Sequence, residues 1–239
     1  MKKNLERINT TLNNIEDKGK YILIFILYFL GFVLGPSLFY SIVNKFYPID
    51  DIMIANLIGN GLYSVFIFII LHKVLINDFK KLKKNKINNM RIMFKWWGIG
   101  LAIMMFSNLI INEIVFNGSI AANEEANREI ILASPYLSIF LAVFLAPFVE
   151  ELTFRYGLRK IFKNVWFYAI TSGVIFGLLH AIAGIESAKD LIELLYIIPY
   201  GALGFAFSVI YYKTDNIWVN IFTHMLHNGI VYSMLLLFV

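Results

Sequence analysis

The sequence predicts an all-α fold, a polytopic membrane helix bundle of about seven transmembrane helices with the N-terminus inside the cell and the C-terminus outside. Of the 239 residues, 59% are hydrophobic and only 15% are charged, and the mean hydropathy is +0.69. The hydrophobic fraction and the mean hydropathy lie far above those of a soluble domain of this length, and the charged fraction lies below. A helix needs about 20 apolar residues to cross ~30 Å of hydrocarbon, and such runs occupy residues 21–44, 53–72, 96–116, 136–154, 165–184, 191–211 and 217–239. We therefore expect a multi-pass protein of the cell membrane in contact with the lipid bilayer.

The distribution of basic residues predicts the orientation. Of the 21 Lys and Arg residues, 18 fall in the alternate segments 1–20, 73–95, 155–163 and 212–215. The other three, Lys45, Arg128 and Lys189, fall in the remaining segments. Cytoplasmic loops carry the excess of Lys and Arg, so the N-terminus is predicted inside and the C-terminus outside. The lysine run between residues 80 and 86 is flanked by two spans, which is typical of a lipid-facing loop rather than a nucleic-acid site.

The chain divides into two regions by the position of its polar groups. Residues 1–134 are expected to hold three spans and the basic cytoplasmic loop, and their first span is too long for a cleaved signal peptide. Residues 135–239 are expected to hold four spans and nearly all the polar groups that lie deep within spans. The acidic loop 117–134 between them suggests no function. The absence of cysteine excludes disulfides, thiolate metal sites and a cysteine nucleophile.

The fourth span carries three ionisable residues, Glu150, Glu151 and Arg155. Each such group at membrane depth costs at least about 2.5–3.5 kcal/mol, which makes it a candidate functional residue. Glu151 and Arg155 have i,i+4 spacing and are predicted to neutralise each other on one helical face. Glu150 is rotated by ~100° and is left free for chemistry. Alternatively, all three only mark the cytoplasmic end of the span, where charges cost little.

Three histidines follow on later spans. His180 ends a stretch in which Gly173 and Gly177 predict close helix approach. On the last span, His224 shares a face with the i,i+4 residue Asn228, whereas His227 points elsewhere and is predicted to have a packing or supporting role. A lone buried histidine is often only a hydrogen-bonded packing residue. Polar groups that share a face of a membrane helix need water, a ligand or a polar partner.

Together these residues resemble the motifs of the CPBP family of intramembrane peptidases, which includes CAAX prenyl endopeptidases and bacteriocin-processing or immunity proteins of the Abi-like group. The motifs are Glu-Glu-x-x-x-Arg, Phe-x-x-x-His and His-x-x-x-Asn in that order, and the resemblance covers residues 135–230. They fall on Glu150, Glu151, Arg155, Phe176, His180, His224 and Asn228. The resemblance implies a helical membrane bundle with Glu150, His180, His224 and Asn228 in the catalytic cavity. Glu151, Arg155, Phe176 and His227 would then support them.

Two mechanisms are consistent with these residues. In the first, Glu150 is the general base toward a water, His224 and Asn228 donate hydrogen bonds to the oxyanion, and His180 positions the water or protonates the leaving amine. In the second, Glu150, His180 and His224 bind a divalent metal, with Zn²⁺ the best match, and leave one position open for water. Linear counting places His180 ~20 Å along its helix, deeper than Glu150, so the fifth span is expected to tilt. The sequence does not choose between the mechanisms.

The resulting functional prediction is an intramembrane endopeptidase of the CAAX type, metal-dependent in the second mechanism, that cleaves a membrane-associated peptide or protein. One alternative is a non-catalytic membrane scaffold or bacteriocin-immunity protein of the same fold. Another is a small-solute or proton-coupled transporter, against which stands the absence of repeats and of paired broken helices. Prenylated proteins, secreted peptide precursors and signalling peptides all remain open as substrates, and no nucleic-acid partner is expected.

Overall fold

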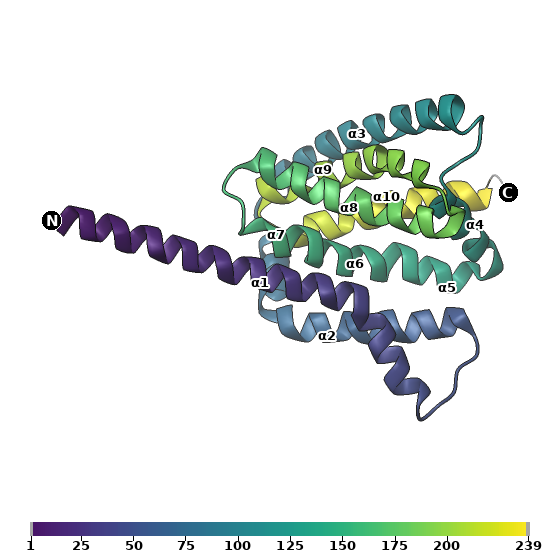
Figure 1. Ribbon diagram of the computed structural model, residues 1–239, viewed down its shortest axis with the longest axis horizontal. Coiled ribbons are helices and arrows are strands. Elements are labelled where there is room, and N and C mark those ends of the chain that lie inside the picture. The colour runs from purple at the N-terminus through teal and green to yellow at the C-terminus, as the bar shows by residue number, and fades with distance from the viewer. Residues whose placement is uncertain (1, 238–239) are drawn as a thin grey trace.

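The computed structural model describes the backbone of residues 2–237 and the side chains of residues 19–51 and 53–237. Within those residues the chain forms helices joined by short loops, with no strand, and the termini lie at opposite ends of the bundle (Figure 1). The α-helices are α1 (Lys2–Asn44), α2 (Ile52–Lys81), α3 (Lys86–Ile110), α4 (Ala122–Ala133), α5 (Pro135–Ile139), α6 (Ala146–Glu150), α7 (Gly157–Arg159), α8 (Val165–Ala188), α9 (Ile197–Thr214) and α10 (Ile217–Leu237). Three π-helical segments, η1 (Ile111–Val115), η2 (Phe140–Leu145) and η3 (Glu151–Tyr156), and one 3₁₀ segment, η4 (Leu191–Tyr196), complete the fold.

Six stretches of the described helices are long and apolar enough to cross a membrane, which confirms a multi-pass membrane protein. They are Gly19–Asn44, Met53–Lys81, Lys86–Val115, Pro135–Arg159, Val165–Ala188 and Leu191–Thr214. The seventh predicted span corresponds to α10, which has 21 residues but is not among the six. Its polar residues include Asn220, His224, His227 and Asn228. Termini at opposite ends are what an odd number of crossings requires (Figure 1), while the count of seven and the orientation stay predictions.

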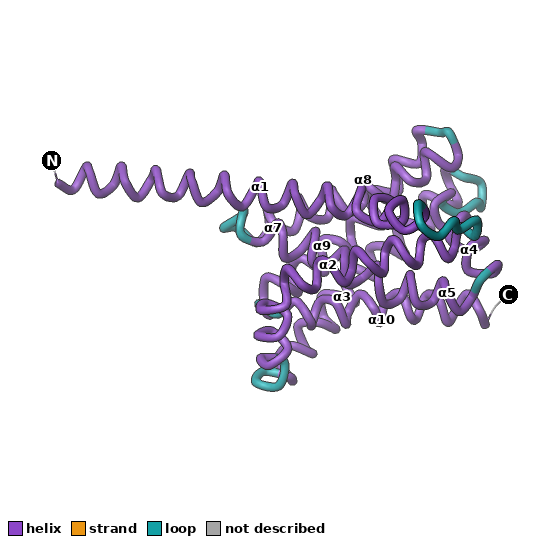
Figure 2. The backbone as a smooth tube through the Cα atoms, turned by 90° about the horizontal axis from the view of Figure 1, so that it is seen from below, coloured by secondary structure: helices purple, strands orange, loops and turns teal. Residues whose placement is uncertain are grey.

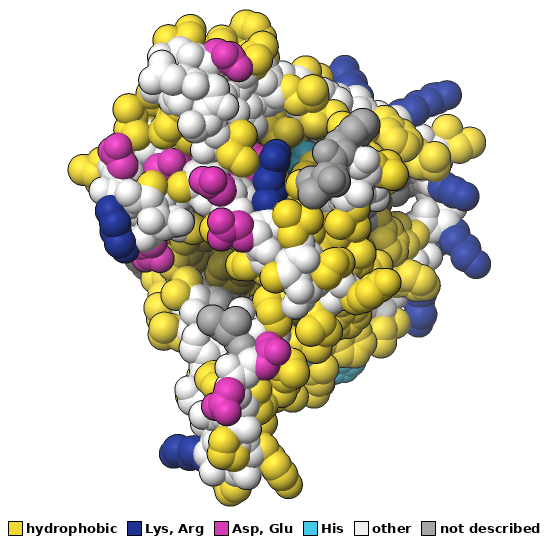
Figure 3. All heavy atoms as spheres, turned by 90° about the vertical axis from the view of Figure 1, so that its right-hand side faces the viewer, with side chains coloured by type: hydrophobic (Ala, Val, Ile, Leu, Met, Phe, Trp, Pro, Cys, Tyr) yellow, Lys and Arg dark blue, Asp and Glu magenta, His cyan; other side chains and the backbone are white. Residues whose placement is uncertain are grey.

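The connecting loops gather at the two ends of the bundle (Figure 2). At the end that carries the C-terminus, acidic side chains are prominent on the surface (Figure 3). They include the exposed residues Asp50, Asp51, Glu125, Glu129, Glu186 and Asp190. The lysine-rich turn between α2 and α3 lies at the other end, so the charge asymmetry read from the sequence coincides with the two ends of the fold.

Helices α8 and α9 approach each other closely through glycine, as the sequence predicts. A Cβ at Gly173 would lie 2.7 Å from the Gly201 carbonyl oxygen, and one at Gly177 would lie 2.5 Å from that of Ile197. Since real Cβ atoms do not approach a backbone oxygen so closely, only glycine permits this packing. The contact holds the helix that carries His180 against the start of α9.

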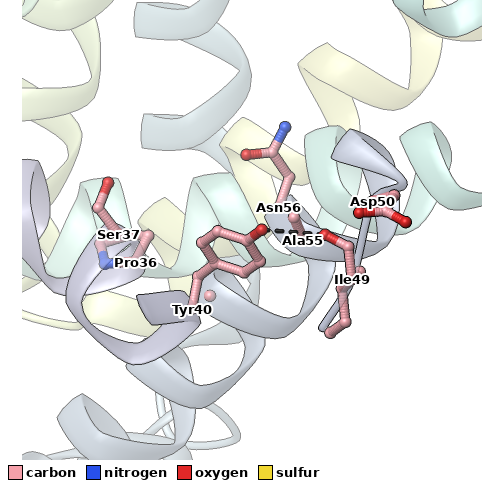
Figure 4. Close-up of a pocket in the computed structure, with 8 residues that line it drawn as sticks. Pro36, Ser37, Tyr40, Ile49, Asp50, Ala55 and Asn56 are labelled. Atoms are coloured by element: carbon pink, nitrogen blue, oxygen red, sulfur yellow. Dashed lines mark hydrogen bonds between the residues drawn. The ribbon is translucent and has the colours of Figure 1, made fainter. Parts of the chain in front are cut away.

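Helices α1 and α2 pack against each other at the edge of the bundle (Figure 1), and buried residues of α2 share a core with the fourth span and α10. Pro36 lies inside α1. A Cβ at Gly59 of α2 would lie only 2.4 Å from the carbonyl oxygen of Pro36. Beside this crossing is a cavity of about 360 Å³, where the Tyr40 hydroxyl donates to the Ile49 carbonyl at 3.0 Å (Figure 4). The cavity is lined by Pro36, Ser37, Tyr40, Ile49, Asp50, Ala55, Asn56 and Gly59, none of which is a predicted site residue.

Candidate active site

The fourth span changes its helical register on both sides of Glu150. The π-helical segments η2 and η3 flank the short α6 that ends at Glu150. Such single-turn π segments inside α-helices are frequent at functional sites. Glu150 and Glu151 therefore lie at a junction between α-helical and π-helical geometry rather than within a uniform helix.

Pro147 leaves one backbone carbonyl of this span without its helical donor. The Ala146 N–H bonds to the Leu141 carbonyl in the i→i−5 register, so the next donor in that register, to Ala142, would be residue 147. Proline has no N–H. The Asn228 Nδ2 of α10 donates to the Ala142 carbonyl instead, at 2.8 Å. The Asn228 side chain therefore joins α10 to the fourth span. Its hydrogen bond to the oxyanion stays a prediction.

Helix α8 holds the second π segment in place. The Ser172 hydroxyl donates to the Phe154 carbonyl at 3.1 Å, and the Tyr168 hydroxyl donates to the Arg155 carbonyl at 3.0 Å. Both side chains are fully buried. Buried carbonyls need hydrogen-bond partners. The side chains of α8 supply donors to two carbonyls of the π-helical segment.

Glu151 and Arg155 form the ion pair that their spacing predicts. Arg155 Nε lies 3.3 Å from Glu151 Oε2, and both side chains are fully buried. The guanidinium also lies over the Phe176 ring at 4.5 Å and the Phe207 ring at 5.4 Å. Cation–π contacts of this kind stabilise a desolvated arginine.

Glu151 also positions His224. Glu151 Oε1 lies 2.8 Å from His224 Nδ1, and Asn220 Nδ2 donates to Oε2 of the same carboxylate. A carboxylate only accepts hydrogen bonds, so the proton of the neutral imidazole is on Nδ1 and a lone pair is on Nε2. That Nε2 lies 3.8 Å from Glu150 Oε2. Sequence reasoning missed Asn220, although it precedes His224 by four residues on the same helical face.

The Phe176 ring packs against both His224 and His180. Its ring centroid is 4.7 Å from that of His180 and 6.0 Å from that of His224. The His180 ring also stacks on Tyr200, with centroids 4.6 Å apart and planes at 20°. Its Nδ1 lies 3.3 Å from Nδ2 of Asn123, in α4. Neither Asn123 nor Tyr200 was predicted from the sequence, because neither residue belongs to a recognisable motif.

The predicted zinc ligands are only partly brought together. Glu150 and His224 face each other, but His180 is engaged by Asn123 and Tyr200. Among residues whose side chains are described, no three His, Asp or Glu residues are grouped in a way that could hold a metal ion. As placed, the donor set does not fit Zn²⁺, and the metal site stays a prediction.

His227 lies beside the site rather than in it. It is 7% exposed, its Nδ1 lies 3.4 Å from Trp97 Nε1, which donates to it, and its ring packs against Phe207. This environment suits the packing role that the sequence predicts. The contact joins α10 to α3 and so helps to fix the helix that carries His224.

Comparison with known proteins identifies the family. Residues 132–230 match a family described as Type II CAAX prenyl endopeptidase Rce1-like. The chain is also 31% identical over 199 residues to a Bacillus subtilis (strain 168) protein named "Putative membrane peptidase YdiL", with 78% of this chain and 75% of that protein covered. The chain belongs to the CPBP family of intramembrane peptidases. All the predicted site residues of this CPBP protein lie within the matched segment. No solved structure matches it.

Proposed function

We propose that this CPBP protein is an intramembrane endopeptidase in which Glu150 activates a water against a peptide bond. The proposal depends chiefly on the placement of Glu150 Oε2 opposite His224 Nε2, 3.8 Å apart. That distance is too long for a direct hydrogen bond. One water can donate to both acceptors, at ~2.8 Å from each, and so present its oxygen lone pairs to a substrate carbonyl.

Each residue around the pair has a separate part in the proposed reaction. Glu150 takes one proton from the water as it attacks the carbonyl carbon, and returns that proton to the leaving amine when the C–N bond breaks. His224 accepts the other hydrogen of the water and fixes its orientation. Glu151 holds His224 through Nδ1, and Arg155 offsets the charge of Glu151. The attacking group is thereby held in position before the substrate arrives.

The substrate is proposed to be a membrane-associated peptide or protein. The described spans present large apolar side chains to the surroundings, so a substrate that reaches the site from the bilayer meets a lipid-facing surface. The matched family description names a prenyl endopeptidase, which makes a prenylated peptide the first substrate class to test. Secreted peptide precursors and signalling peptides are the other two.

The test is cleavage by the purified protein in lipid vesicles, with a library of membrane peptides as substrate. Wild type should cut at least one peptide, and Glu150→Gln should not. Glu186→Gln is the matched control, because Glu186 is an exposed glutamate on α8 that touches none of the site residues described above. A wild-type protein that binds peptides but cuts none would favour the non-catalytic scaffold or immunity function. Solute uptake into the vesicles without cleavage would favour a transporter.

A further inference from the structure

Asp78 is a buried carboxylate that the proposed reaction does not use. It lies in the last turn of α2, beside the lysine-rich turn (Figure 1), and is 6% exposed. The sequence places it in the basic segment 73–95 and marks it with no motif. We propose that Asp78 is a positioning residue, which caps α10 and thereby fixes where His224 lies beside Glu150 and Glu151. The expected effect on cleavage rests on the proposed peptidase function.

The cap of α10 comes from a residue far away in the chain. Asp78 Oδ2 accepts from the Ile217 N–H at 3.2 Å, and Ile217 is the first residue of α10. The first N–H groups of a helix have no partner within it, and an aspartate is among their preferred partners. Asn216, which precedes the helix, caps only the Trp218 N–H, at 3.0 Å. Lys81 binds Oδ1 of Asp78 at 3.1 Å and leaves Oδ2 to the helix.

Two more hydrogen bonds join the end of α2 to the start of α10. Asn216 Nδ2 donates to the Asp78 carbonyl oxygen at 2.7 Å, and Trp218 Nε1 donates to the Leu75 carbonyl oxygen at 2.8 Å. Successive residues of a helix point about 100° apart. Bonds from the consecutive residues 216–218 therefore resist both sliding of α10 along its axis and rotation about it.

The position of α10 determines the position of the site residues that it carries. Asn216, Asn220, His224 and Asn228 are spaced by four residues and lie on one helical face. Asn220 and His224 both contact Glu151. His224 follows the capped residue by seven positions, ~10.5 Å along the axis at 1.5 Å per residue. Because the helix fixes this rise, a shift at the capped end moves His224 relative to Glu151.

The contacts of His224 leave little room for such a shift. Its Nδ1 lies 2.8 Å from Glu151 Oε1, and its Nε2 lies 3.8 Å from Glu150 Oε2. The second distance suits one water between two acceptors, as proposed above. Functional groups generally need to be held within ~0.5 Å of their productive geometry. A residue that fixes α10 thus acts on the reaction through His224, although it lies outside the site.

The first test observes His224 directly and needs no substrate. In protein labelled with ¹⁵N-histidine, the ring ¹⁵N and ¹H resonances of His224 report its hydrogen bond to Glu151, and His224→Gln identifies them. Asp78→Ala should shift these resonances. Asp78→Asn should shift them less, because its amide oxygen still accepts from the Ile217 N–H. Unchanged His224 resonances in Asp78→Ala would overturn the proposal.

Asp51→Ala is the matched control, because it also removes an aspartate cap from a long helix. Asp51 Oδ1 accepts from the N–H groups of Met53 and Ile54, at the opposite end of α2 from Asp78. Both substitutions should lower the unfolding temperature, but Asp51→Ala should keep the wild-type His224 resonances and cleavage. Equal changes of both in Asp51→Ala would show a general loss of stability and would overturn the positioning role.

The second test measures cleavage by the same variants in lipid vesicles. Asp78→Ala should lower kcat by about 10-fold or more, because a 1 Å misplacement caused by a distant substitution can cost ~10²-fold. KM should change little, and Asp78→Asn should recover part of kcat. Wild-type kcat in Asp78→Ala would overturn the positioning role.

The two tests separate this proposal from the proposed function. A wild type that cleaves nothing, with His224 resonances that shift in Asp78→Ala, would overturn the peptidase function and leave the positioning of His224 standing. Should Asp78→Ala not fold, Trp218→Phe takes its place in both tests. It removes the Nε1 donor to Leu75 and keeps an aromatic ring, so His224 resonances and kcat should change in the same way, and wild-type values of both would overturn the proposal.

Discussion

Glu150 and Glu151 are adjacent in the chain but have different surroundings. The carboxylate of Glu151 is saturated by Arg155, Asn220 and His224 and is fully buried. Glu150 is 14% exposed along its side chain, and its Oε2 lies 3.8 Å from His224 Nε2. A carboxylate with three partners is held in place by them, whereas one that faces an acceptor is available to a water. The difference between the two residues predicts different effects of the same substitution.

Glu150→Gln should leave the fold intact and remove turnover. Glutamine preserves the volume and a hydrogen-bonding group but is not a base, so kcat should fall by at least ~10², the low end for loss of a general base. Peptide cleavage in vesicles and thermal unfolding of the same sample measure both effects. Wild-type cleavage by this variant would remove Glu150 from the mechanism.

Glu151→Gln should destabilise the protein as well as inactivate it. Removal of one partner of a buried ion pair typically costs ~3–5 kcal/mol, because the other charge is left unpaired. The double variant Glu151→Gln with Arg155→Met should regain part of this stability but not activity, since His224 still lacks its carboxylate. A Glu151→Gln protein that unfolds at the wild-type temperature would show that the pair contributes nothing to the fold.

At the scale of the helices, the fourth span is held by its neighbours rather than by its own backbone pattern. Its two π segments place Glu150 and Glu151 at a change of register. Side chains of α8 satisfy two of its carbonyls, and α10 satisfies a third through Asn228. Because irregular backbone is costly in a bilayer unless it is paired, these contacts explain how the span tolerates Pro147 beside the site.

Pro147 and Asn228 should be energetically coupled. Asn228→Ala alone leaves the Ala142 carbonyl without a donor, which costs ~1–3 kcal/mol for a buried group. In a Pro147→Ala background, residue 147 supplies an N–H and the cost of Asn228→Ala should shrink. Thermal or denaturant unfolding of the four proteins in the cycle measures this coupling. Strictly additive costs would mean that Asn228 does not compensate for the proline.

If Asn228 also donates a hydrogen bond to the oxyanion, its removal will impair cleavage even where stability is restored. The Pro147→Ala, Asn228→Ala double variant should then recover stability but not cleavage. We expect cleavage to recover with stability, because the Nδ2 of Asn228 already donates to Ala142. A stable double variant that is inactive would support the oxyanion role predicted from the sequence.

At the scale of the whole molecule, charge distinguishes the two ends of the bundle. Acidic side chains are prominent at the end of the C-terminus, and the lysine-rich turn lies at the other end (Figures 1 and 3). The same asymmetry predicts which end faces the cytoplasm, because Lys and Arg are retained there. By the same prediction, α4 at the end of the C-terminus would lie on the outer side of the membrane.

A reporter fused after Val239 should therefore be extracellular, and one inserted beside Lys84 should be cytoplasmic. Enzymatic reporters that are active on only one side of the membrane read both positions. A cytoplasmic C-terminus would mean an even number of crossings and would remove α10 from the spans. Two reporters on the same side would contradict the predicted topology as well.

Chelation decides between the two predicted mechanisms. With water activated by Glu150, cleavage should persist after o-phenanthroline treatment and in a preparation shown to be metal-free. We expect this result because His180, the third predicted ligand, is engaged by Asn123 and Tyr200. Loss of cleavage on chelation with recovery on Zn²⁺ addition would instead support the metal site predicted from the sequence and require His180 to leave Asn123.

The sequence by itself determined the helical membrane class, most span positions, the Glu151–Arg155 pair and the family motifs. These follow from local rules, since burial in lipid fixes the length and hydropathy of a span and helix geometry fixes which neighbours share a face. It could not assign partners that lie far apart in the chain. Three contacts depend instead on helix packing, which no spacing within one helix encodes. Glu151 holds His224, Asn228 replaces the donor missing at Pro147, and Asn123 reaches His180.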